Sequence, residues 1–234
     1  MVFDPETLKD SGASNIANYK KINADVKGWL KVPDTNISYP VLHDADPSHF
    51  YLDHDIYKAK SKNGVVYADP AVRFGGRNQI SDNNVLYGHN WTNYSANPKI
   101  GDANDVMFAQ LAAYHHLDFA KAHPYIFYST ENEEMTWQVF AAFYTDIDFY
   151  YNIANPKSKS DYDYIIQGAK SRSRHIFDTP VTSSDKIITL STCTRAYGKS
   201  DRQRFVVMAK LMPKGAATKA ISVTANPKPV LPKL

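Results

Sequence analysis

Apolar residues near the start of the chain recur at intervals of three and four positions. This spacing is typical of one face of a helix, and it includes Ile16, Tyr19, Ile22, Val26, Trp29 and Leu30. The glycine and the proline that bound the segment Gly28–Pro33 are residues that end such a pattern. The sequence therefore predicts an N-terminal helical part over residues 5–30.

Further along the chain the pattern changes to the alternation that is typical of strands. Ile37, Tyr39 and Val41 alternate with other residues around Pro40. A proline cannot donate a hydrogen bond to a strand ladder, so we expect this strand at a sheet edge or at a bulge. Short segments rich in β-branched and aromatic residues predict further strands over Gly64–Ala68, Asn84–Tyr87, Tyr125–Ser129, Met135–Thr145, Lys186–Cys193 and Arg204–Met212.

Two segments between these strands have helical spacing. They are Asp105–Ala120 and Asp161–Ile176, and the second starts with a capping-box-like arrangement of Ser160 and Asp163. Because strands and helices do not alternate regularly, an antiparallel barrel is favoured over a doubly wound sheet. We predict a mainly β (α+β) domain over residues 1–212, with a helix inserted before the penultimate strand. Residues 213–234 contain several prolines and lysines and are predicted to form an extension outside the core.

Composition narrows the classes of function. The 234 residues carry a net charge of +3 without a dense basic block, which gives nucleic-acid binding little support. No metal-binding spacing, GxGxxG pattern or phosphate-binding loop is present. No apolar run approaches the ~18 residues of a membrane span, and Met1–Lys9 lacks the pattern of a secretory signal. Composition leaves open whether the protein is cytoplasmic or has lost a targeting segment.

The chain has a single cysteine, at the end of a predicted strand. Within Lys186–Cys193, a strand would place Thr189, Ser191 and Cys193 on one face, so that this face grades from hydroxyl groups to a thiol. Such a strand presents a reactive group at the mouth of a sheet. A lone cysteine is, however, more often a small buried apolar residue, so an inert thiol at the end of a buried strand is the alternative.

A nucleophilic thiol needs a basic or cationic partner near neutral pH. Among eight histidines, His89 has the most suggestive context, because it follows a predicted strand and a glycine. Arg204 opens the last predicted strand, eleven residues after Cys193, and a hairpin would bring the two ends together. A guanidinium there could stabilise an oxyanion. Arg204 could instead be an ordinary surface residue, and Arg202 lies close enough to be confused with it.

Several motifs together resemble the sortase family. Thr189-Leu190-Ser191-Thr192-Cys193 is similar to the family's TLxTC motif, Arg204–Val207 to its arginine-initiated final strand, and Tyr87-Gly88-His89 to its histidine segment. The opening Asn23–Leu30, followed by Ile37–Val41, resembles the family's N-terminal pattern. The two predicted helices flanking the barrel are similar to those of class B members. The pilin-polymerising class C is less favoured, because Asp46-Pro47-Ser48 and Asp69-Pro70-Ala71 do not supply its Asp-Pro-aromatic lid motif.

The resemblance implies an eight-stranded antiparallel barrel and a specific set of site residues. Cys193 would attack the carbonyl after a threonine in a sorting signal and form a thioacyl enzyme. His89 would act as general acid and base, and Arg204 would stabilise the oxyanion or align the signal. Flanking groove residues would be Ser191, Thr192 and Tyr87, with Leu42 as an apolar wall. No metal or organic cofactor is implied.

The resemblance also implies partners and a location. The substrates would be surface proteins with a C-terminal sorting signal, and the acceptor would be the amine of a peptidoglycan precursor of the lipid II type. The enzyme would act on the extracellular face of a Gram-positive cell membrane, held by an N-terminal anchor that is absent from this chain. Two other functions compete: a cysteine hydrolase with water as acceptor, and a non-catalytic β-rich surface-binding module in which Cys193 is structural.

Overall fold

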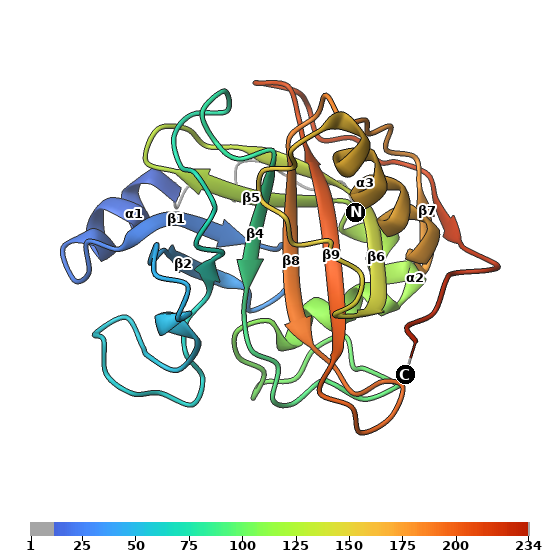
Figure 1. Cartoon of the computed structure of the whole chain (residues 1–234), viewed down its shortest axis with the longest axis horizontal. Helices are drawn as coiled ribbons and strands as arrows, with labels where there is room; N and C mark the ends of the chain where they lie inside the picture. Colours follow the sequence, from blue (N-terminus) through green and yellow to red (C-terminus); the bar gives the residue numbers. More distant parts are fainter. Residues whose placement is uncertain (1–11, 234) are drawn as a thin grey trace.

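The computed structural model describes residues 12–233, and its centre is a closed barrel of eight strands (Figure 1). Around the barrel the strand order is β1-β2-β3-β4-β8-β9-β6-β5. These strands span Val26–Lys31 (β1), Ser38–Leu42 (β2), Tyr67–Ala68 (β3), Asn83–Tyr87 (β4), Tyr125–Thr130 (β5), Thr136–Asp146 (β6), Ile187–Cys193 (β8) and Gln203–Leu211 (β9). A small separate sheet pairs β7, His175–Phe177, with β10, Val223–Ala225.

Five helical segments surround the barrel in the described part of the chain. They are α1 (Gly12–Lys20), the 3-10 turns η2 (Phe50–Leu52) and η3 (Ala109–His115), α2 (Leu117–Ala122) and α3 (Lys159–Arg172). The predicted helix over Asp105–Ala120 is therefore realised as a 3-10 turn followed by a short α-helix. Within residues 12–233, none of the helices is long and apolar enough to cross a membrane.

The barrel is mixed, whereas the sequence predicted an antiparallel one. Two neighbouring pairs, β2 with β3 and β4 with β8, run parallel. A parallel pair needs a long crossover connection, and the segment between β4 and β8 supplies one that contains α2, α3 and three strands. The prediction of eight strands is confirmed, and the direction of these two pairs is corrected.

The predicted N-terminal helix is too long. The helix ends at Lys20, and Val26–Lys31 forms β1, whose side chains are alternately buried and half-buried. Between them the side chain of Asn23 accepts a hydrogen bond from the Asp25 backbone at 2.9 Å, which is a turn that ends helical geometry. Pairing of β1 with both β2 and β5 then outweighs the local helical pattern. The first part of the predicted helical stretch, and the segment Met1–Lys9, lie outside the described residues.

Pro40 occupies the kind of position that the sequence predicted. It lies in β2 opposite Trp29 of β1, and next to β1's own irregularity between Val26 and Gly28. On its other side β2 pairs with β3 through Leu42 alone. Most of that side is therefore an open edge, where a missing N–H group breaks no ladder bond.

The inserted helix α3 comes before β8, as the sequence predicted, but its cap is displaced by two residues. Ser158 accepts a hydrogen bond from the backbone of Asp161 at 3.1 Å, whereas the predicted pair was Ser160 and Asp163. The helix covers the outer face of the barrel and forms a second apolar layer there, made of Tyr162, Ile165, Ile166 and Ala169 against β6, β8 and β9.

The proline-containing extension packs along the domain in its described part. Val223 is only 3% exposed and joins the main core. Tyr125 donates from its hydroxyl to the Lys219 carbonyl at 2.9 Å, and the backbone of Lys233 donates to the Asp146 carboxylate at 2.7 Å. The second contact reaches the end of β6, next to the loop that forms one wall of the candidate site.

Candidate active site

One end of the barrel carries an open cleft of about 280 Å³. The cleft lies where β4 and β8 end and where β9 begins, and Figure 1 shows that β4 and β8 point the same way. Its walls come from four parts of the chain that are distant in sequence. The lining residues are His49, Leu52, Tyr67, Tyr87, Gly88, His89, Ile147, Phe149, Tyr151, Asn152, Ser191, Thr192, Cys193 and Arg204.

Cys193 is the exposed last residue of an otherwise buried strand. The six residues before it in β8 are all buried, and the thiol emerges at the cleft. The strand thus fixes the backbone of Cys193 while leaving the sulfur accessible. This placement removes the alternative of a cysteine sealed in the core.

Arg204 lies directly across from Cys193. The two residues are paired in the antiparallel register of β8 and β9, as the predicted hairpin requires. The guanidinium Nη1 donates to the carbonyls of Asp201 and Gln203, at 2.7 and 2.9 Å, which holds the group against its own turn. Arg202, the residue that could be confused with it, instead pairs with Asp148 at 2.6 Å and is not part of the cleft lining.

His89 reaches the cleft through the parallel pairing of β4 and β8. Tyr87 pairs with Ser191, so the residues that follow each of them leave the sheet at the same edge. Thr192 then donates from its hydroxyl to the Gly88 carbonyl at 2.6 Å, and this bond ties the two strand ends together. Gly88 is required here, because a Cβ atom would lie 2.7 Å from the Phe108 ring.

The imidazole of His89 has two further contacts. Its Nε2 donates to the Leu52 carbonyl at 2.8 Å. One face of the ring stacks on Trp91, with a centroid distance of 4.8 Å and an interplanar angle of 26°. Because a carbonyl only accepts hydrogen bonds, this geometry places a proton on Nε2.

Two tyrosines, the buried Tyr151 and the half-buried Tyr87, form the floor of the cleft. The Tyr151 hydroxyl and the Ser191 hydroxyl lie 2.8 Å apart and share a hydrogen bond. Burial raises the pKa of Tyr151 to about 12, with the Ser191 hydrogen bond and the charge of Arg204 opposing it. Burial, and next the nearby Asp69 carboxylate, also raise the pKa of Tyr87, which donates to Asp69 at 2.9 Å. Both phenols therefore stay protonated at neutral pH, which keeps the floor free of anionic charge.

The structure brings together six of the seven residues that the sequence pointed to. Cys193, His89, Arg204, Ser191, Thr192 and Tyr87 all line the cleft. Leu42 does not: it has no exposed surface and packs in a side cluster with Ile16, Val26 and Tyr51. It pairs with Tyr67, a lining residue, so its contact with the cleft is indirect. We therefore leave Leu42 out of the proposed groove.

Sequence reasoning missed two walls of the cleft. His49, Leu52 and Tyr67 come from the connection between β2 and β3 and from its end. Ile147, Phe149, Tyr151 and Asn152 come from the connection between β6 and α3. Neither connection carries a motif that marks it as functional. The run of aromatic residues near Phe149 is the one signal, and it is equally typical of a core segment. Within residues 12–233, no cluster of three or more metal-ligating side chains occurs.

Comparison with known proteins shows to which family this chain belongs. Residues 30–212 match the family model of the sortase domain. The chain belongs to the sortase family. It is 31% identical to sortase B of Listeria monocytogenes over 217 residues, which is 88% of this chain and 80% of the relative. It is likewise 31% identical to sortase B of Staphylococcus aureus over 196 residues, 82% of this chain and 72% of that relative.

Solved structures agree with this assignment. A Staphylococcus aureus sortase B–substrate complex matches with a TM-score of 0.72 and 27% identity, covering 90% of each chain. Sortase B of Clostridium perfringens matches with a TM-score of 0.70 and 30% identity, covering 84% of this chain and 99% of that one. This sortase is therefore a cysteine transpeptidase of the sortase B type, with the mixed eight-stranded barrel of that group.

Proposed function

We propose that this sortase cleaves a sorting signal after a threonine and transfers the new carboxyl end to an amine, with Cys193, His89 and Arg204 as its catalytic residues. The observation that carries the proposal is that these three side chains line one open cleft at the ends of β4, β8 and β9. The lining of the same cleft by Ser191, Thr192 and Tyr87 supports them as substrate-groove residues.

In the proposed first half-reaction, the Cys193 sulfur, as thiolate, adds to the carbonyl carbon of the threonine. A tetrahedral oxyanion forms, the C–N bond breaks, and the leaving amine takes a proton from His89. In the second half-reaction an incoming amine attacks the thioacyl carbon and gives its extra proton to His89. The thiolate leaves, and the enzyme returns to its starting state.

The contacts of His89 support a particular nitrogen for the proton transfers. Nε2 is held by the Leu52 carbonyl, so we assign the transfers to Nδ1. Arg204 supplies donors for the oxyanion from the position opposite the thiol. Its planar fork suits an oxygen that develops charge, because several N–H groups point to the same side.

The comparisons support the choice of partners. The chain is similar to a Staphylococcus aureus sortase B bound to a substrate and to a sortase B complexed with triglycine. We propose surface proteins with a C-terminal sorting signal as donors, and a glycine-type amine of a peptidoglycan precursor as acceptor. The site of action would be the extracellular face of a Gram-positive cell membrane, to which an N-terminal anchor would hold the enzyme. No metal or organic cofactor is needed for these steps.

A peptide screen tests this function. Fluorogenic peptides of the LPxTG and NPxTN types are incubated with the enzyme, with and without triglycine, and the products are identified by mass spectrometry. We expect one type to be cleaved after threonine and to yield a peptide–triglycine adduct. Hydrolysis alone, even at high triglycine, would favour the cysteine hydrolase.

Alkylation separates the remaining alternative, a non-catalytic binding module. Iodoacetamide should label Cys193, and the cleaved peptide type should slow the labelling. A thiol that reacts with neither reagent nor peptide would support a structural role instead. A pilin-polymerising class C activity is disfavoured, since the relatives named above are all sortase B.

A further inference from the structure

We propose that Trp91 is a positioning residue that holds the imidazole of His89 in its working orientation. The inference goes beyond the three catalytic residues, and it rests on the proposed role of His89 in proton transfer. Trp91 is not among the residues that line the cleft. It acts on the reaction through the histidine rather than by touching the substrate.

Trp91 joins two loops across His89. Its indole stacks on the imidazole at 4.8 Å, and its Nε1 donates to the Lys62 carbonyl at 3.1 Å. His89 itself donates to the Leu52 carbonyl of the same loop, which connects β2 and β3. The imidazole is therefore fixed by one hydrogen bond at Nε2 and by an aromatic plane over its face. We call these contacts the histidine clamp.

The residues on both sides of Trp91 are anchored, so the indole is carried by a fixed backbone. Asn90 is 5% exposed, and its amide donates to the carbonyls of Asn93, at 2.8 Å, and Cys193, at 3.4 Å. On the other side, Thr92 donates from its hydroxyl to the buried carboxylate of Asp105. The segment thus connects the histidine loop to the backbone of the nucleophile.

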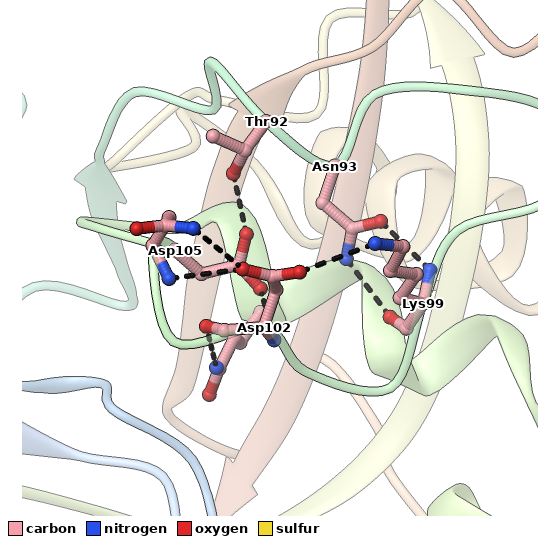
Figure 2. Close-up of polar contacts among 7 residues, drawn as sticks. Thr92, Asn93, Lys99, Asp102 and Asp105 are labelled. Atoms are coloured by element: carbon pink, nitrogen blue, oxygen red, sulfur yellow. Dashed lines mark hydrogen bonds and ion pairs between the residues drawn. The ribbon is translucent and has the colours of Figure 1, made fainter.

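Figure 2 shows the network that supports this segment. Asp105 also accepts from the backbone of Asp102 at 2.9 Å, and the Asp102 carboxylate accepts from Lys99 at 3.1 Å. Asn93 closes the loop by exchanging two hydrogen bonds with the Lys99 backbone, at 2.8 and 2.9 Å. A loop held at this many points is a rigid support for the indole, which is what orienting a catalytic ring requires.

The exposure of Trp91 argues against a purely structural role. The residue is 50% exposed, so its burial contributes less to folding than that of a core aromatic residue. A large aromatic side chain that covers a catalytic ring rather than the core is explained by positioning. Small displacements of a catalytic group are costly, since about 1 Å can lower a rate on the order of 10²-fold.

The test compares Trp91→Ala, which removes the stack, with Trp91→Phe, which keeps an aromatic plane but loses the indole N–H. Tyr57→Ala is the matched control, because Tyr57 is an exposed aromatic residue on the facing loop. In Trp91→Ala we expect kcat to fall about tenfold with KM within about twofold. Trp91→Phe should recover most of the loss, and Tyr57→Ala should match the parent enzyme.

A spectroscopic arm tests the clamp without turnover. The ring protons of His89 are assigned in histidine-labelled protein by comparison with His89→Gln. They should lie upfield because of the indole ring current and move downfield in Trp91→Ala. An unchanged His89 signal in Trp91→Ala, or equal loss of kcat in the alanine and phenylalanine variants, would overturn the clamp. If the parent enzyme turns over no peptide while the His89 signal moves as expected in Trp91→Ala, the clamp stands and the proposed function fails.

Discussion

Two regions in the described part of this sortase bring together histidine, arginine and tyrosine side chains: one is an open cleft, and in the other a histidine is hydrogen-bonded to both an arginine and a tyrosine. The first is the cleft, with His89, Arg204 and Tyr151. The second, which we call the closed cluster, consists of His115, Tyr144, Arg174 and His175, at the junction of η3, β6 and β7. The same residue types serve different ends in the two places.

In the closed cluster the His115 imidazole is hydrogen-bonded to two other members, whereas Nε2 of His175 donates to the Tyr114 carbonyl at 3.0 Å. Arg174 donates to Nε2 of His115 at 3.4 Å, and Nδ1 of His115 lies 2.9 Å from the Tyr144 hydroxyl. Since arginine can only donate, Nε2 is an acceptor and the imidazole is neutral. Burial, then the charges of Arg174, His116 and His175, hold the pKa of His115 at about 4. His115 therefore stays uncharged at neutral pH and bonds to its neighbours in the fold. The side chains of the cleft, in contrast, face an open space that can take a substrate.

The largest effect that separates the two regions is expected for Cys193, the proposed nucleophile. Cys193→Ala should lower turnover of the cleaved peptide by at least about 10³-fold, because the covalent route is lost. The side chain is exposed, so the melting temperature should stay within a few degrees of the parent value. Peptide cleavage and a thermal melt measure both quantities. Near-normal turnover would show that the cleft works without this thiol.

Arg204 is expected to give the next largest effect. Arg204→Ala removes the proposed oxyanion donor and should lower kcat about 10²–10³-fold. Arg204→Lys keeps the charge but not the planar fork, so it should recover only part of the loss. Arg202→Ala is the matched control, because that arginine pairs with Asp148 outside the cleft. Equal losses in the Arg202 and Arg204 variants would contradict the assignment.

The closed cluster should set a pH dependence of stability. Unfolded His115 binds its proton near its usual pKa of 6.5, whereas folded His115 does so only near pH 4. The contribution of neutral His115 to the free energy of unfolding is thus complete above pH 6.5 and is lost as the pH falls towards 4. Solvent screening limits the loss to about 1–2 kcal/mol. Urea titrations between pH 4 and 7 should show this fall, and His115→Gln should flatten it; an equally steep profile in that variant would place the effect elsewhere.

The smallest expected effects come from a matched pair of tyrosines. Tyr151→Phe and Tyr144→Phe each remove one buried hydroxyl with a partner, Ser191 in the cleft and His115 in the closed cluster. Each should cost about 1 kcal/mol in free energy of unfolding. Only Tyr151→Phe should also change peptide kinetics, with KM raised a few-fold. If Tyr144→Phe altered KM as much, the two regions would not be functionally separate.

The sequence predicted the relative placement of Cys193 and Arg204 better than the placement of His89, the third proposed catalytic residue. Alternation along Lys186–Cys193 and Arg204–Met212 was enough to place Cys193 opposite Arg204, because hairpin pairing is local. His89 was suggested by its strand-to-loop context and by family resemblance. The parallel β4–β8 pair that delivers it cannot be read from periodicity, because it depends on the long crossover between Tyr87 and Ile187.

The same difference between local and long-range pairing explains the predictions that were wrong. Val26 and Leu30 fit a helical period as well as a strand period, and long-range pairing with β2 and β5 decided for the strand. Leu42 has the apolar character of a groove wall, but only the barrel geometry shows that its face is buried. Trp91 had no motif of its own, and its contact with His89 appears only when the two loops are placed together.

The parallel pairing of β4 with β8 has a consequence for the order in which the enzyme matures. The Asn90 side chain donates a hydrogen bond to the Cys193 carbonyl, and the two residues are 103 positions apart along the chain. Closing so long a loop has an entropic cost that short hairpins do not bear, so such contacts tend to form late in folding. A nascent chain can therefore carry the β8–β9 hairpin with its thiol while the imidazole is still elsewhere. Catalytic competence would arrive as one of the last events of barrel closure.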